Sequence, residues 1–334
     1  MSTTITLIQG DGIGPEITDA VVSILDAAGA DLIYDKHDAG ITSFNACGKL
    51  ITEELIASIK LHKVALKGPI TTPIGDGFRS INVSLRLMFD LYQNIRPCKS
   101  IEGVATKFEG IDIVLFRENT EGLYSGLELF DEKHQIYDSI ARVTRLGCDR
   151  IVRSAFEYAV KHNRKKVTIV HKANILKSSS AFFLQVAKEV AAEFPQVAWE
   201  DKIIDNMCMQ LVAYPERYDV LVTTNLFGDI LSDLMAALVG GLGIVAGANV
   251  GKDCAIFEAV HGSAPDIAGQ NKANPTALLQ SAIMMLRHLS KFEVADKIEQ
   301  ALFTTLKDKD CCTGDLGGKA GTAEFTKSLI ANMK

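Results

Sequence analysis

The sequence predicts an α/β protein with a largely parallel sheet, on two observations. Apolar strand-like runs alternate along the chain with longer segments of helical spacing, and the strand-like runs are continuously apolar. Continuous apolarity is typical of strands buried on both faces, as they are in parallel sheets covered by helices. A length of 334 residues suggests about two domains.

The elements can be assigned in chain order from these patterns. The expected strands are ITLIQ at 5–9, VALKGPI at 64–70, IDIVLFREN at 111–119, KVTIVHK at 166–172 and DVLVTTN at 219–225. The expected helices are the segments 15–29, 52–61, 149–163, 178–194 and 275–289, the last beginning after Asn274 as a cap. Glycines gather at 240–251, where we expect the chain to pass between domains.

The opening stretch ITLIQGDGIGPEI resembles a dinucleotide-binding fingerprint without matching it. The fingerprint needs glycine at the first, third and sixth places, and here Gly10 and Gly12 fit whereas Pro15 occupies the sixth. Asp35 lies roughly where a ribose-binding acid would be sought. The spacing favours a tight strand-to-helix turn, because glycine permits a positive φ and proline suits the first turn of a helix.

Composition excludes several classes of protein. The net charge of −6 gives no basic face for nucleic acid. No apolar run reaches the roughly 18 residues that a membrane span needs. Seven cysteines without a C-x-x-C pair argue against a disulfide framework and a zinc ribbon. The start MSTTITLIQGDG lacks a basic or amphipathic leader, so we expect a cytoplasmic protein, or a mitochondrial matrix protein if a leader was removed.

Arginines form the first candidate constellation. Arg86 ends SINVSLR, Arg96 precedes a proline, and Arg117 follows the apolar run IDIVLF. A buried guanidinium demands a partner, and its fork binds carboxylates in a bidentate manner. A single such arginine is more often part of a structural ion pair, but the three together favour a polyanionic substrate.

Paired aspartates form the second constellation. Asp229 and Asp233 of NLFGDILSDL lie one helical turn apart, so on a helix their carboxylates face the same way. A divalent cation would relieve their repulsion, and oxygen ligands select Mg²⁺ or Mn²⁺ rather than Zn²⁺. The alternative is a solvated acidic face. Because the surrounding residues are apolar, the metal site and the solvated face are about equally good interpretations.

Two further segments carry weaker signals. Lys172 follows the strand-like run KVTIVH and would serve as an acid or base if burial lowered its pKa, although a surface lysine is the commoner case. In FEAVHGSAPDIAGQNKANP at 257–275, small residues after His261 would let backbone N–H groups approach a phosphate. The alternative for this second segment is an irregular loop between domains.

Together these segments resemble the decarboxylating β-hydroxyacid dehydrogenases, the family of isocitrate, isopropylmalate and homoisocitrate dehydrogenases. The resemblance runs in consistent order from GDGIGPEI at residue 10 to GGKAGTAEF ending at residue 325. It implies an isopropylmalate-dehydrogenase-like α/β fold that is not a Rossmann fold. It also implies a discontinuous large cofactor-binding domain of residues 1–99 and 252–334, and a small domain of residues 100–251 with the dimer interface and metal site.

The resemblance further assigns a role to each matching residue. It implies Tyr124 and Lys172 as acid/base residues and Asp205, Asp229 and Asp233 as ligands of Mg²⁺ or Mn²⁺. It implies that Ser80, Asn82, Arg86, Arg96 and Arg117 bind substrate. The cofactor residues that it implies are Thr72, Asn82, His261, Gly262, Ser263, Ala264, Pro265, Asp266, Ile267 and Asn274. Lys172 and Asp205 would come from the second subunit of a homodimer with shared sites.

The expected reaction is the oxidative decarboxylation of isocitrate to 2-oxoglutarate and CO₂ with reduction of NAD, a step of the tricarboxylic acid cycle. Polar Ser80 and Asn82 favour isocitrate, since an isopropyl group would leave them unpaired. Homoisocitrate, isopropylmalate and tartrate remain alternative substrates. A non-catalytic regulatory subunit of a heteromeric isocitrate dehydrogenase is the alternative of another class.

Cofactor choice is expected to depend on Asp266 and Ile267. NADP-using bacterial members of the family resemble this loop but carry lysine and tyrosine there, which would bind a 2′-phosphate. Aspartate instead accepts hydrogen bonds from ribose hydroxyls and repels the phosphate. The alternative is that Asp266 only caps the following turn. We therefore expect NAD, with no nucleic acid and no membrane among the partners.

Overall fold

The computed structural model describes residues 2–72 and 80–333. The chain forms two compact units, the first made of Met1–Leu85, Ser100–Glu109 and Val239–Lys334 and the second of Arg86–Lys99 and Gly110–Leu238. The expected domain limits near residues 99 and 252 stay a prediction, because a unit of packing need not be a unit of function. Among the described residues, no helix combines the length and apolar character that crossing a bilayer requires.

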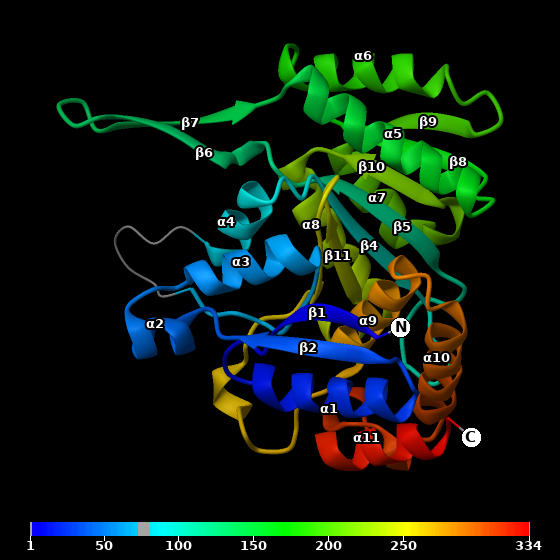
Figure 1. Ribbon diagram of the computed structural model, residues 1–334. Helices are drawn as coiled ribbons and strands as arrows, with labels where there is room; N and C mark the ends of the chain where they lie inside the picture. The colour runs from blue at the N-terminus through cyan, green and yellow to red at the C-terminus, as the bar shows by residue number, and fades with distance from the viewer. Residues whose placement is uncertain (1, 73–79, 334) are drawn as a thin grey trace. The chain divides into compact units, whose positions relative to one another are not determined.

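The first unit is built on a mostly parallel set of strands in the order β2-β1-β3-β12-β11. Of these, β1 and β2 are seen side by side in Figure 1. Only the β11–β12 pair of this set is antiparallel. The strands are β1 (Thr3–Ile8), β2 (Leu32–His37), β3 (Val64–Lys67), β11 (Ala246–Val250) and β12 (Ala255–Ala259). The helices are α1 (Gly14–Ala27), α2 (Ile41–Cys47), α3 (Glu53–His62), α9 (Thr276–His288), α10 (Phe292–Lys307) and α11 (Thr322–Ala331). Helix α4 (Ile81–Met88) crosses the limit between the units.

The second unit has the strand order β4-β5-β10-β8-β9, in which only β4 and β5 pair antiparallel. Its sheet strands are β4 (Gln93–Lys99), β5 (Asp112–Glu118), β8 (Lys166–His171), β9 (Ala198–Ile203) and β10 (Val220–Thr223). Its helices are α5 (Arg145–Lys161), α6 (Ser179–Ala191), α7 (Ile204–Ala213) and α8 (Asn225–Val239). Phe116, Phe156, Phe183 and Val222 join the sheet, α5 and α6 in one core.

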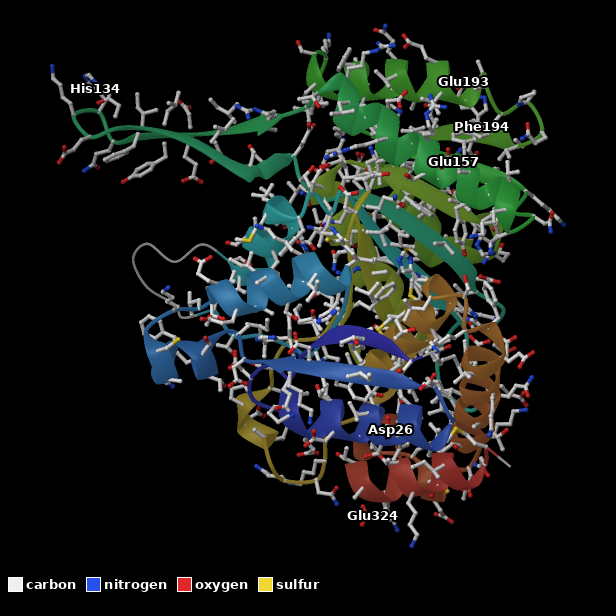
Figure 2. The ribbon with its side chains drawn as sticks, viewed as in Figure 1. Asp26, His134, Glu157, Glu193, Phe194 and Glu324 are labelled. Carbon is white, nitrogen blue, oxygen red and sulfur yellow. The ribbon has the colours of Figure 1, made fainter. Side chains whose placement is uncertain are left out.

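A two-stranded hairpin of β6 (Gly122–Asp131) and β7 (Ile136–Arg142) extends from the second unit. Its tip, marked by His134, points away from α5 and α6 in Figure 2. Apolar side chains remain exposed along it, including Leu129 at 60% and Tyr137 at 76%. Every residue of β7 is exposed, so this strand has no buried face of the kind that predicts a strand of the core.

The α/β prediction is confirmed, and so is the tight turn at the start of the chain. Gly10 and Gly12 have φ of 81° and 59°, and α1 begins at Gly14 with proline in its first turn. A Cβ on Gly10 would lie 2.2 Å from the Pro69 carbonyl oxygen, so this close approach also requires glycine. Asp35 instead accepts a 2.6 Å hydrogen bond from Ser58.

Two details of the helix predictions are wrong. Helix α5 begins at Arg145 rather than near residue 149, because the Thr144 side chain caps it by accepting a 3.0 Å hydrogen bond from the Gly147 N–H. The N-cap of α9 is Pro275 rather than Asn274, although Asn274 Oδ1 accepts a 3.0 Å hydrogen bond from the Thr276 N–H.

Candidate active site

The arginines singled out in the sequence are buried in the second unit. Arg86 lies on α4, Arg96 on β4 and Arg117 near the end of β5, with exposed fractions of 9%, 8% and 1%. Burial lowers the pKa of Arg117, and the positive charge of Arg86 lowers it further. Buried positive charges close together favour binding of an anion between them, and a polycarboxylate would meet that demand.

Helix α8 holds the Arg117 guanidinium in a fixed orientation. Asn225 Oδ1 accepts hydrogen bonds from Arg117 Nε at 2.9 Å and Nη2 at 2.7 Å, and Asp229 accepts one from Nη1. Gly228 lies against the aliphatic part of Arg117, since a Cβ there would be 2.4 Å from Arg117 Cγ. Sequence reasoning missed Asn225 and Gly228, although both belong to the NLFGDILSDL motif.

Tyr124 on β6 joins this cluster through Asp229. Its hydroxyl donates to Asp229, and the Arg117 guanidinium lies 5.2 Å from its ring centroid. Burial and then the hydrogen bond to Asp229 raise the pKa of Tyr124, so the phenol keeps its proton. A protonated phenol beside a buried arginine can act as a proton donor.

The paired aspartates differ in their electrostatics. Although burial opposes ionisation, the Arg117 charge keeps the pKa of Asp229 below its usual value. Burial and the Asp229 charge raise the pKa of Asp233, against the opposing charges of Arg96 and Arg117. The Asp233 carboxyl is thus harder to ionise beside Asp229. The pair fits a divalent cation, because the cation would stabilise the negative charge of both carboxylates.

The third expected metal ligand is not grouped with these two. Asp205 lies in the first turn of α7, accepts a hydrogen bond from Lys172 Nζ and is 68% exposed. In residues 2–72 and 80–333, no three histidine, cysteine, aspartate or glutamate side chains are close enough to hold a metal ion. Within the described part of one chain, Asp205 is therefore not brought together with Asp229 and Asp233.

Lys172 follows β8 and is not deeply buried. Its side chain is 25% exposed and pairs with Asp205, while its backbone N–H donates a 2.7 Å hydrogen bond to Ser180 Oγ. The hydrogen bond from Lys172 lowers the pKa of Asp205. Burial was the expected means of activating Lys172, whereas the structure gives it a carboxylate partner.

The expected cofactor residues lie in the first unit, where polar atoms point to a ligand. His261 Nδ1 lies 2.9 Å from the Gly262 carbonyl oxygen, which places a proton on Nδ1 and leaves Nε2 as an acceptor. His261 Nε2 and Asn82 Oδ1 are buried without a hydrogen-bond partner among the described residues. Burial lowers the pKa of His261. Buried acceptors of this kind fit donors such as ribose hydroxyls or an amide.

The loop that carries His261 is constrained by its neighbours. Ala264 adopts φ 36° and ψ 62°, a left-handed conformation that is uncommon for alanine. Thr71 Oγ1 and Ser263 Oγ are 2.6 Å apart, and Thr72 Oγ1 accepts a 3.3 Å hydrogen bond from the Ile81 N–H. Ser80 is exposed and its carbonyl accepts a hydrogen bond from Ser84 Oγ at the start of α4.

Asp266 and Ile267 belong to the short helix η3 (Pro265–Ile267). Asp266 is exposed, and its backbone carbonyl accepts a 2.7 Å hydrogen bond from Gln270 Nε2. Ile267 lines a cavity of about 800 Å³ that Lys272, Asp315 and Lys319 also line. Asp315 and Lys319 carry no signal in the sequence, because only the fold brings segment 314–321 beside the loop.

Fold and site thus define a class: an α/β protein with buried arginines facing paired aspartates, and a separate loop with buried hydrogen-bond acceptors. The family model described as isocitrate/isopropylmalate dehydrogenase matches residues 4–329. The chain belongs to this family, and the expected non-Rossmann α/β fold is confirmed.

Individual relatives are similar over nearly the whole chain. A protein of Drosophila melanogaster, named as a probable mitochondrial NAD isocitrate dehydrogenase of the alpha type, is 49% identical over 335 residues, covering 98% of this chain and 87% of that protein. A regulatory component of a mitochondrial NAD isocitrate dehydrogenase of Dictyostelium discoideum is 49% identical, covering 98% and 91%. The crystal structure of isocitrate dehydrogenase from Methylococcus capsulatus is 48% identical and has a TM-score of 0.96, covering 99% of each chain.

The curated relatives overturn the expectation of a cytoplasmic protein. Both of those described above are named as mitochondrial, as are further relatives from a plant and a nematode. The expectation depended on an N-terminal stretch without a targeting pattern. Such a stretch does not report the compartment, because processing removes targeting segments.

Proposed function

We propose that this protein catalyses the NAD-dependent oxidative decarboxylation of isocitrate to 2-oxoglutarate and CO₂. The observation that carries the proposal is the buried arginine cluster, in which Arg117 is oriented by Asn225 and Asp229. The family match and the names of the relatives support the activity and the use of NAD. A tricarboxylate satisfies several buried guanidinium groups at once, which a substrate with an isopropyl group in place of one carboxylate does not.

Each group of the chain then has a defined task. Arg86, Arg96 and Arg117 bind the substrate carboxylates, and Ser80 and Asn82 provide polar contacts to the remaining carboxylate. Lys172 accepts the proton of the substrate hydroxyl, and Tyr124 returns a proton to the carbon from which CO₂ has left. Tyr124 suits this task because its raised pKa keeps it protonated before the step.

Two bound groups complete the chemistry. The 261–267 loop would hold NAD, which would supply the hydride acceptor. Asp229 and Asp233, with Asp205 of a second copy, would hold Mg²⁺ or Mn²⁺, which would supply Lewis-acid polarisation of the substrate oxygens. The donor set supports this choice of metal, since it contains only carboxylates.

A homodimer with shared sites is part of the proposal. Asp205 and Lys172 form their own pair, and apolar side chains near them are exposed, with Ile175 at 67% and Met209 at 51%. The apolar β6–β7 hairpin is a second surface that association would cover (Figure 1). A two-stranded ribbon with exposed apolar residues on its faces is marginal alone and favours pairing with another copy.

A regulatory function is the second candidate. The relative named as regulatory is as similar to this chain as the one of the alpha type, so overall similarity does not separate the two. The complete set of Arg86, Arg96, Arg117, Tyr124, Lys172, Asp205, Asp229 and Asp233 supports catalysis, since a chain that only regulates has no need of every member.

Steady-state kinetics of the purified chain separate these candidates. Isocitrate, homoisocitrate, isopropylmalate and tartrate are each supplied with Mn²⁺ and with NAD or NADP, and absorbance of the reduced cofactor is followed. We expect turnover with isocitrate and NAD to exceed every other combination. No turnover by the chain alone, with stimulation of a catalytic partner, would establish the regulatory function instead.

A further inference from the structure

The turn and first helical residues at the start of the chain, Asp11 to Glu16, contact both ends of the loop that carries His261. This stretch has no assigned task in the reaction. It leaves β1, makes the tight glycine turn and enters α1. The loop 261–274 runs from the end of β12 to the start of α9.

The first contact fixes the N-terminal end of the loop. Ile13 N–H donates a 2.8 Å hydrogen bond to the Ser263 carbonyl oxygen. A Cβ on Gly12 would lie 2.1 Å from that same oxygen, so the two backbones are closely packed. Buried Asp11 accepts a 2.8 Å hydrogen bond from the Thr71 N–H, and Thr71 in turn contacts the Ser263 hydroxyl.

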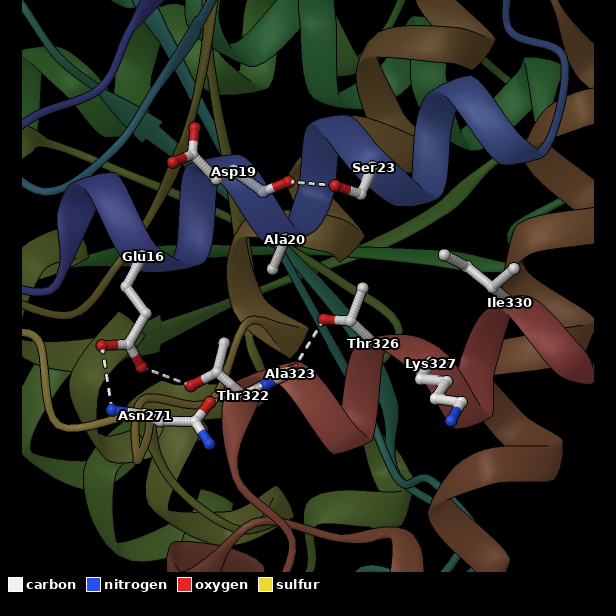
Figure 3. Close-up of a pocket in the computed structure, with 10 residues that line it drawn as sticks. All are labelled: Glu16, Asp19, Ala20, Ser23, Asn271, Thr322, Ala323, Thr326, Lys327 and Ile330. Atoms are coloured by element: carbon white, nitrogen blue, oxygen red, sulfur yellow. Dashed lines mark hydrogen bonds between the residues drawn. The ribbon is translucent and has the colours of Figure 1, made fainter.

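The second contact fixes the C-terminal end of the loop through one carboxylate. Glu16 accepts hydrogen bonds from the Asn271 N–H at 3.3 Å and from the Thr322 hydroxyl (Figure 3). It also accepts one from the Ala273 N–H at 3.1 Å. Thr322 is buried at the start of α11, and its N–H donates to the Asn271 carbonyl at 3.2 Å. Donors from separate segments therefore converge on the Glu16 carboxylate.

We infer that Glu16 is a positioning residue for NAD, which acts by holding segment 271–273 and hence the cofactor loop in its binding conformation. The inference rests on the proposed function for the identity of the ligand. Hydrogen bonds to a carboxylate are stronger than those between neutral groups, and the left-handed conformation of Ala264, which is uncommon for alanine, indicates that neighbouring contacts hold this loop. A loop held in advance loses less conformational entropy when its ligand binds.

Glu16→Gln tests the inference, because it keeps the size of the side chain but places an amide NH₂ against N–H donors. Asp19→Asn is the matched control, since Asp19 lies one turn further along α1, lines the same hollow and bonds to Gln9 instead (Figure 3). We expect Glu16→Gln to weaken NAD binding, measured by calorimetry, about tenfold. Hydrogen exchange of the amides of Asn271 and Ala273 should accelerate, while kcat at saturating NAD and the KM for isocitrate stay within about twofold of wild type.

A second pair of variants decides the matter if Glu16→Gln does not fold. Thr322→Val removes the hydroxyl without changing the shape of the side chain, and Thr322→Ser retains the hydroxyl. We expect only the valine variant to weaken NAD binding and accelerate exchange in segment 271–273. Unchanged NAD affinity in Glu16→Gln and Thr322→Val would overturn the inference. So would control variants that weaken NAD binding as much as the test variants, that is, Asp19→Asn as much as Glu16→Gln and Thr322→Ser as much as Thr322→Val.

The two readouts also separate this inference from the proposed function. Calorimetry and hydrogen exchange are made without isocitrate. Wild type that binds NAD but does not turn over isocitrate would contradict the proposed function alone, whereas unchanged NAD affinity and unchanged loop exchange in the variants would contradict only the role of Glu16.

Discussion

At the scale of single residues, Arg117 shows what the sequence could and could not predict. An arginine after the apolar run IDIVLF is conspicuous because burying its charge demands a partner. The partners were not predictable, because Asn225, Gly228 and Asp229 lie on a helix more than a hundred residues away along the chain. The resemblance implied His261 and Asn82 as cofactor residues, but the burial of His261 Nε2 and Asn82 Oδ1 was not predictable, since it depends on tertiary packing.

Gly228→Ala is predicted to damage the Arg117 site through a single methyl group. A Cβ there would lie 2.4 Å from Arg117 Cγ, and Arg117 is too buried to move aside. We expect a loss of about 1–3 kcal/mol in the free energy of unfolding of the second unit, with a fall in kcat/KM for isocitrate. Gly314→Ala is the control, because its added Cβ would meet no atom within 4 Å. Equal stability of the two variants would contradict the predicted crowding.

His261 is predicted to make stability depend on pH in acid. Burial lowers its pKa from 6.5 in the folded chain, so below that value the unfolded chain binds more protons than the folded one. The free energy of unfolding of wild type should therefore fall as pH drops below 6.5, by at most about 1.4 kcal/mol for each unit by which the pKa is lowered. The difference in the free energy of unfolding between wild type and His261→Asn, measured by chemical denaturation, should not change with pH above 6.5. A difference that is also flat in acid would exclude this account.

At the scale of elements, the core helices and strands were predictable and the irregular ends were not. The apolar runs at 64–70, 111–119 and 219–225 gave strands because their burial is continuous, as in β3 and β10. The start of α5 was misjudged by several residues, since its cap depends on Glu121 of a distant segment. Thr144 donates through its hydroxyl and N–H to Glu121 while it accepts from the Gly147 N–H.

Thr144→Ala is predicted to destabilise α5 more than an isolated cap would. The substitution removes the N-cap acceptor and also deprives Glu121 of a hydroxyl donor. We expect a loss of about 1–2 kcal/mol in the free energy of unfolding of the second unit. Thr144→Ser keeps both hydrogen bonds and should remain within about 0.5 kcal/mol of wild type. The urea unfolding midpoints of the two variants check this, and coincident midpoints would show that the cap contributes nothing.

At the scale of the whole molecule, one chain holds the proposed catalytic groups as two separate sets. Arg117, Tyr124 and Asp229 form one cluster, while Lys172 and Asp205 form their own pair. The family resemblance indicated all five residues. Their spacing in the sequence does not reveal that Lys172 and Asp205 lie apart from the other three in one chain. The exposed apolar residues beside Lys172 and along the β6–β7 hairpin favour a partner of the same kind as the means of joining the two sets.

Hybrid dimers test this arrangement directly. Lys172→Met and Asp229→Asn should each abolish turnover in a homodimer, because every shared site then lacks one group. When the two variants are co-expressed with different tags, a mixed dimer has one site with both changes and one site with neither. Since half of a random mixture is mixed dimer and each mixed dimer has one intact site of two, we expect activity to return to roughly a quarter of wild type, with an unchanged rate at each intact site. A purified mixed dimer without activity would show that Lys172 and Asp229 of the same chain serve one site, and the shared-site dimer would be rejected.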